Sequence, residues 1–102
     1  MSILKSFFSK EENIQASSEL KEFLTDFSIE VMPRTASKIE SFREILPKNT
    51  RVYVAHIDGV PIEEMVDPAK RISNEGFDVM PHFPARIIKD KKMLEEWIQK
   101  YQ

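Results

Sequence analysis

The sequence predicts an α/β protein in which three βα units form a parallel sheet with flanking helices. Three observations support this prediction: three short runs have the composition of strands, each run ends in polar residues, and each is followed by a segment with helical periodicity. The runs are Phe27–Pro33, Arg51–Gly59 and Phe77–Arg86. Because ligands of parallel α/β sheets bind beyond the carboxyl ends of the strands, the polar residues at these ends are the candidate functional residues.

Residues 1–26 are predicted to form a helical lead-in, and residues 27–102 the three βα units. Ser9 and Glu12 have capping-box spacing, and a second helix is expected to start at Ser17 or Ser18. Its apolar face is Leu20, Phe23 and Leu24, and a separate apolar cluster is Ile3, Leu4, Phe7 and Phe8. Packing on a neighbouring element is the favoured role of the cluster, and a membrane-surface or partner helix is the alternative.

Helices are predicted after each strand, at about residues 37–46, 61–76 and 91–101. The first opens with capping-box spacing at Ser37, the second ends at Gly76 as its C-cap, and Asp90 caps the third. Pro68 lies inside the second helix. Since proline removes a backbone donor, a kink is expected there, or a restart with Asp67 as the N-cap.

Composition excludes several classes of function. The chain has 102 residues, a net charge of −2 and no cysteine. Without a basic block, nucleic-acid binding is not expected, and without cysteine there are no disulfides, thiolate metal sites or catalytic thiols. No apolar run approaches the ~20 residues of a membrane span, and no signal peptide is recognised at the start, so we expect a cytoplasmic protein with no membrane partner.

Alternation along the strands predicts where the polar side chains point. If the pattern is unbroken, Glu30, His56 and His82 lie on one face of the sheet, near one end. The same face is expected to carry Met32, Val52, Val54 and Met80, and the opposite face Ile29, Val31, Tyr53, Ala55, Ile57, Phe77 and Val79. The second face is uniformly apolar and would take the helices, whereas the first resembles the inside of a barrel with a polar end.

The three strand ends also carry a resemblance to a known family. SIEVMPRT (Ser28–Thr35), VAHIDGVPIEEM (Val54–Met65) and MPHFPAR (Met80–Arg86) resemble the first three strand ends of methylenetetrahydrofolate reductases, in particular a short bacterial branch. The resemblance runs from about Phe23 to Tyr101. It implies the first three units of a (β/α)8 TIM barrel, a flavoprotein that binds FAD and reduces 5,10-methylenetetrahydrofolate to 5-methyltetrahydrofolate in one-carbon and methionine metabolism.

The resemblance also implies roles for individual residues. Glu30 matches the acid that assists opening of the imidazolidine ring of the folate, and His82 matches a histidine that contacts the flavin. His56 occupies the place of a hydroxyl residue that contacts the flavin in the better-known branch, although the residue type differs. Val31–Arg34 departs from the family pattern of two aromatic residues and two prolines. No substrate-binding residue is assigned by the match.

Length and residue types leave alternatives open. A TIM barrel needs about 200–250 residues, so the 102-residue chain alone is expected to be inactive, and to use folate and NAD(P)H only when further units, copies or a companion chain complete it. The alternative is a non-enzymatic α/β binding or assembly module. His56 and Asp58 with His82 also have the types of a two-histidine, one-carboxylate iron site, which we do not favour. Arg34 and Arg86 are expected to contact phosphate or a folate tail, or to pair with nearby acids.

Overall fold

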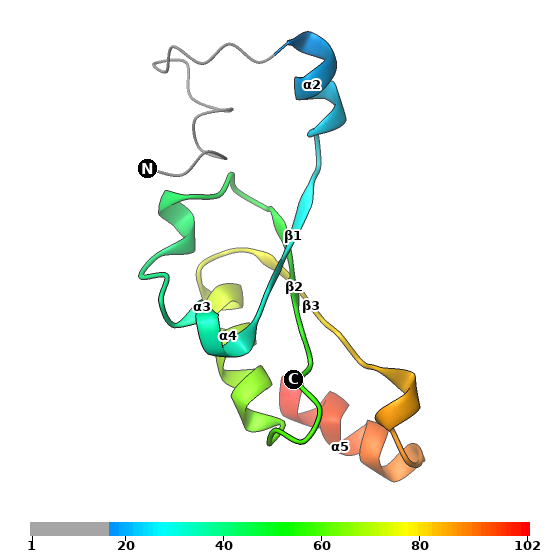
Figure 1. Cartoon of the computed structure of the whole chain (residues 1–102). Helices are drawn as coiled ribbons and strands as arrows, with labels where there is room; N and C mark the ends of the chain where they lie inside the picture. Colours follow the sequence, from blue (N-terminus) through cyan, green and yellow to red (C-terminus); the bar gives the residue numbers. More distant parts are fainter. Residues whose placement is uncertain (1–16) are drawn as a thin grey trace.

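The computed structural model describes residues 17–102 and confirms a small α/β fold with a three-stranded parallel sheet. The strands lie in the order β1-β2-β3, and both neighbouring pairs are parallel (Figure 1). Their bounds are β1 Ser28–Val31, β2 Arg51–Val54 and β3 Asp78–Pro81. The predicted capping box at Ser9 and the apolar cluster from Ile3 to Phe8 lie outside the described residues.

Helices flank the sheet and precede it. Ser17 caps the helix before β1, because its hydroxyl accepts a hydrogen bond from the Leu20 N–H at 3.1 Å, as predicted. The α-helices are α2 Ser18–Phe23, α3 Pro33–Ala36, α4 Glu63–Asn74 and α5 Lys91–Tyr101, and the short 3₁₀ turns are η1 Phe42–Glu44 and η2 Ala85–Ile87. Helix α2 stands apart from the other helices (Figure 1). No helix within residues 17–102 is long and apolar enough to cross a membrane.

The strand register corrects the predicted faces of the sheet. Val52 lies beside Ile29 and Val79, and Val54 lies beside Val31 and Pro81. Since paired residues of parallel strands share a face, Val52 and Val54 point to the helix-covered side. The sequence analysis placed them on the opposite side, so its assignment for β2 is wrong by one residue. Val52 and Val54 are fully buried in this register. A shift by one residue would expose both side chains to water, so their burial favours the observed register.

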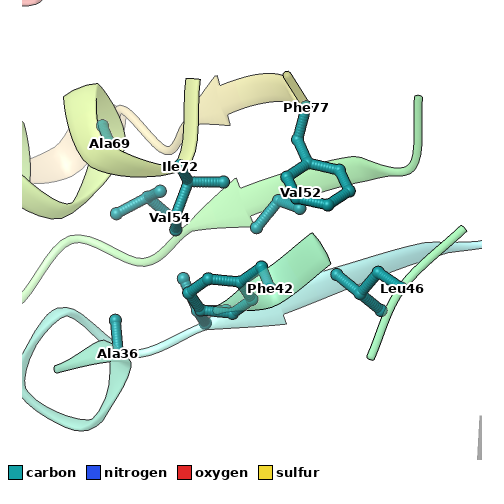
Figure 2. Close-up of a cluster of buried hydrophobic side chains, with 9 residues drawn as sticks. Ala36, Phe42, Leu46, Val52, Val54, Ala69, Ile72 and Phe77 are labelled. Atoms are coloured by element: carbon teal, nitrogen blue, oxygen red, sulfur yellow. The ribbon is translucent and has the colours of Figure 1, made fainter. Parts of the chain in front are cut away.

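A single apolar core lies between the sheet and the helices. Phe42, Val52, Val54 and Ile72 are completely buried. Figure 2 shows how residues from η1, β2 and α4 meet in this cluster, whose buried members are Val31, Ala36, Phe42, Leu46, Val52, Val54, Ala69, Ile72 and Phe77. Burial of large apolar side chains contributes about 1.5–3 kcal/mol each, so this one-sided core is the main source of stability in the described residues.

Helix α4 is continuous through Pro68. The predicted restart at Asp67 is not found, so that alternative is wrong, and the kink stays a prediction. Pro68 has no N–H for the Glu64 carbonyl, but Glu64 is exposed and water can serve that group. The predicted Gly76 stop is confirmed: Gly76 has φ +97° and donates to the Ser73 carbonyl, while Phe77 donates to the Ile72 carbonyl. This is the hydrogen-bond pattern of a Schellman cap.

The helix predicted from Ser37 to Leu46 is not formed. Residues 33–36 form α3 instead, and only the turn η1 follows before β2. The reason is Arg71 of α4, whose guanidinium donates to the carbonyls of Ala36, Ile39 and Glu40. A helix through this segment would direct these carbonyls to its own N–H groups, so the arginine and the helix compete for the same acceptors.

Helix α5 begins as predicted. The Asp90 carboxylate accepts a hydrogen bond from the Met93 N–H at 2.8 Å, which caps the helix. Trp97 is the buried residue of this helix, and Lys100 pairs with Glu63 at the start of α4. Through Trp97, helix α5 packs against the rest of the described fold.

Candidate functional site

The candidate site is the face of the sheet that no helix of residues 17–102 covers, called the open face below. Glu30, Tyr53 and Met80 lie in one row across the three strands, because Glu30 is paired with Tyr53 and Tyr53 with Met80. Tyr53 is 37% exposed, Met80 40% and Met32 47%. Parallel sheets are ordinarily covered on both faces, so these exposed apolar groups mark the face that the described helices leave uncovered.

An ion pair occupies the neighbouring row toward the start of the strands. The Arg51 Nε donates to the Asp78 Oδ2 at 2.8 Å, with Ser28 completing the row on β1. The hydrogen bond to this carboxylate is the main reason that the pKa of Arg51 is raised.

The Glu30 carboxylate is exposed, whereas its position on a largely apolar strand suggested burial. It forms no hydrogen bond or ion pair with residues 17–102. The sheet holds its backbone while the carboxylate stays free of partners. Such a group can give or take a proton from a molecule that lies on the open face.

His82 lies one row beyond Met80. Its backbone N–H donates to the Val54 carbonyl at 3.0 Å, so the β2–β3 ladder extends one residue past the strand. Alternation then puts the exposed imidazole on the same side as Met80 and Glu30. Strand spacing and rise place the Cα atoms of Glu30 and His82 roughly 12 Å apart. A ligand touching both must therefore span the width of the sheet.

His56 does not join Glu30 and His82 on the open face, which corrects the predicted convergence. Its ring stacks on Trp97 of α5, with centroids 4.5 Å apart and an interplanar angle of 25°. The Nδ1 atom is buried without a hydrogen-bond partner among the described residues. Burial lowers the pKa of His56 below 6.5; His82 acts in the same direction, and Asp58 opposes them. Whether His56 contacts a flavin stays a prediction.

An aromatic cluster extends from this stack. Phe83 meets Trp97 edge-on at 6.1 Å and Tyr101 at 5.6 Å between ring centroids. The Tyr101 hydroxyl is buried without a partner in the described chain, and burial raises its pKa. The cluster joins the ends of β2 and β3 to α5, so in this structure the visible role of His56 is packing.

The two candidate arginines are exposed, and the possible metal ligands form no metal site in the described chain. Arg34 lies 3.9 Å from Glu64, an exposed and weak ion pair, which fits the simpler of its two predicted roles. Arg86 is exposed in η2. Within residues 17–102 no group of three histidine, aspartate or glutamate side chains is arranged to hold a metal ion.

Two grooves border the described sheet, and one of them is lined by Tyr53, Arg51 and Asp78 of the open face. One of about 530 Å³ borders the amino ends of the strands, near Asp26 and Arg51, and one of about 590 Å³ lies beside β3 between α4 and α5. Neither is lined by Glu30, His56 or His82. The candidate site is therefore an open face rather than a formed pocket.

The sequence analysis missed Tyr53 as a member of this face. A signal was available in β2, because Val52 and Val54 are more apolar than the residues that alternate with them and so favour the buried side.

No model of a known protein family matches this chain. The functional assignment that follows therefore depends on the strand-end motifs and on the geometry of the open face.

Proposed function

We propose that this chain supplies the first three βα units of a TIM-barrel, flavin-dependent reductase of one-carbon folates, similar to methylenetetrahydrofolate reductases. The proposal is supported mainly by Glu30 on the open face of a parallel sheet and by the ladder bond of His82, from which alternation puts the imidazole on the same side. The three strand-end motifs occur in family order, and two of them bring the matched acid and the matched flavin contact to that face. The chain acts when further parallel strands complete the sheet.

The open face suits a flat aromatic cofactor such as the flavin of FAD. Tyr53 and Met80 form a flat apolar surface between Glu30 and the His82 row. The exposed His82 imidazole can donate or accept a hydrogen bond at its edge. His56 is turned toward Trp97, so His82 is the histidine that we assign to the flavin. These residues fit the group.

A reduced flavin held on this face would supply the hydride that turns the methylene carbon of the folate into a methyl group. Glu30 would donate a proton to the ring nitrogen of the folate as the bond between that nitrogen and the methylene carbon breaks. The reaction would consume one hydride and one proton in all. Glu30 is suited to this step because its carboxylate is free of partners in the described chain and stands on a face that completion would close to water.

Replacing the carboxylate tests the assignment. In protein whose sheet is completed, Glu30→Gln is expected to lower the rate of 5,10-methylenetetrahydrofolate reduction by about 10²–10⁴-fold, the usual contribution of a positioned acid. Glu44→Gln, on the exposed turn η1, is the matched control and should leave the rate unchanged. Equal rates for wild type and Glu30→Gln would contradict the role of Glu30.

The second candidate function is an assembly module without catalysis. It is favoured by the two free sheet edges and by the exposed apolar residues Met32, Tyr53 and Met80. A protein that associates and yet neither binds FAD nor reduces folate would identify this function. Glu30→Gln would then alter stability alone.

A further inference from the structure

The two outer strands of the sheet have complementary edges, neither of which pairs with another strand of residues 17–102. The Ala55 N–H donates to the Val31 carbonyl, and the His82 N–H donates to the Val54 carbonyl. In a parallel ladder alternate residues face the neighbouring strand. Ser28 and Glu30 of β1 therefore direct their backbone groups away from β2, and Val79 and Pro81 of β3 direct theirs away from β2 on the other side.

Pro81 makes these two edges different. It has no N–H, so β3 offers the carbonyls of Val79 and Pro81 but only one donor, the Val79 N–H. The β1 edge offers the N–H groups of Ser28, Glu30 and Met32, while the Met32 carbonyl already accepts from α3. A donor-rich edge and an acceptor-rich edge thus stand at opposite sides of the same sheet.

We propose that the β3 edge of one copy pairs in parallel with the β1 edge of a second copy of this chain. The pairing that matches the faces puts Ile29 of the second copy beside Val79, and Glu30 of the second copy beside Met80. Three hydrogen bonds then form: Val79 N–H to the Ser28 carbonyl, Glu30 N–H to the Val79 carbonyl, and Met32 N–H to the Pro81 carbonyl. The Glu30 carbonyl of the second copy is the one acceptor left unpaired, because the Pro81 opposite it has no N–H to donate.

The side chains agree with this pairing. A groove of about 590 Å³ runs beside β3 and is lined in part by Ala69, Val79, Pro81 and Tyr101. Ile29 of the second copy, which is half-buried in its own copy, would point to this side of the sheet and border the apolar part of the groove. Pairing would remove the rest of its side chain, and Val79 beside it, from water.

Pairing of like edges is less favourable. Two β1 edges in full antiparallel overlap would place Glu30 directly opposite Glu30, and like charges in that position are destabilising. Two β3 edges would both contribute Pro81, and with it two missing donors. Head-to-tail pairing is the arrangement that avoids both problems, and it can continue from copy to copy until a ring closes.

Association would also shorten the distance between the candidate site residues. Glu30 of the second copy would stand one strand from His82, with Cα atoms roughly 8 Å apart instead of roughly 12 Å within one copy. The pairing itself does not depend on the reductase proposal. Its test, the association state, is separate from any measurement of FAD or folate.

Single cysteines give a direct test of the register, because the chain has none of its own. Ser28 and Asp78 lie two strands apart in one copy, on either side of Arg51, at roughly 10 Å, which is beyond the ~7 Å limit for a disulfide. Across the proposed interface they are neighbours. Ser28→Cys protein mixed with Asp78→Cys protein should therefore give the mixed disulfide in large excess over both symmetric ones under mild oxidation.

Sedimentation velocity and edge variants complete the test. Wild type should sediment above the 11.9 kDa of one chain, with a mass that rises with concentration. Val79→Pro, which removes the one donor of the β3 edge, should weaken association at least tenfold. Val79→Ala keeps the N–H and controls for lost packing, and circular dichroism confirms that both variants fold. A monomer at all concentrations, symmetric disulfides in excess, or Val79→Pro associating like Val79→Ala would overturn the proposal.

Discussion

Arg71 determines the course of the chain between β1 and β2, and its removal is the most informative change to the fold. Its guanidinium donates to the Ala36 carbonyl at 3.0 Å, to the Glu40 carbonyl at 3.1 Å, and to the Ile39 carbonyl. It also lies over the Phe42 ring, 5.4 Å from the centroid. Arg71→Met should therefore release the segment that covers one side of the core.

The size of the effect follows from these contacts. A hydrogen bond from a charged donor contributes about 1.5–3 kcal/mol, but the Arg71 side chain is 35% exposed, so we take about 1 kcal/mol for each of the two better-buried bonds. The cation–π contact adds about 0.5 kcal/mol. Arg71→Met should thus lower the free energy of unfolding by about 2–3 kcal/mol, which for a domain of this size lowers Tm by about 10–20 °C.

Urea unfolding followed by far-UV circular dichroism measures this loss. It should be done at one fixed protein concentration, because association would add to stability. Arg43→Met is the matched control: Arg43 donates to the Glu75 and Asn74 carbonyls from an exposed position, where water can replace it, and we expect a loss of at most about 1 kcal/mol. Equal losses in the two variants would refute the account of residues 37–46.

Two further predictions concern pH and backbone conformation. Burial holds the pKa of His56 below 6.5 in the folded state, so the unfolded state binds the proton first as pH falls. The free energy of unfolding should decrease as pH drops below about 6.5 and level off below the folded-state pKa, whereas His56→Phe should lose this part of the pH dependence in urea titrations. Gly76→Ala should cost about 1–2 kcal/mol in the same assay, because φ is +97° although no atom obstructs the added Cβ; an unchanged stability would contradict the Schellman cap.

The α/β class, the three parallel strands and the helix caps at Ser17, Gly76 and Asp90 were predictable because they depend on local signals. Strand composition, capping side chains and a glycine stop act within a few residues of one another. The helix expected from Ser37 was not predictable in this way. Its failure depends on Arg71, more than 30 residues further along the chain.

The site was predictable in part. Glu30 lies on the open face as the sequence analysis expected, whereas His82 follows the end of β3 and its place on that face stays an inference from alternation. His56 was placed on the wrong side, because the face of β2 was inferred from alternation without weighing burial. Val52 and Val54 gain most from facing the helices, and that gain turns Tyr53 to the open face and His56 toward Trp97.

The central claim is that the open face of the sheet binds a flavin, and FAD titration of the associated protein tests it most directly. FAD fluorescence should change saturably as protein is added, and His82→Ala should weaken binding at least tenfold while the far-UV circular dichroism spectrum is unchanged. The absence of saturable binding in associated protein, or equal affinity in wild type and His82→Ala, would contradict the claim.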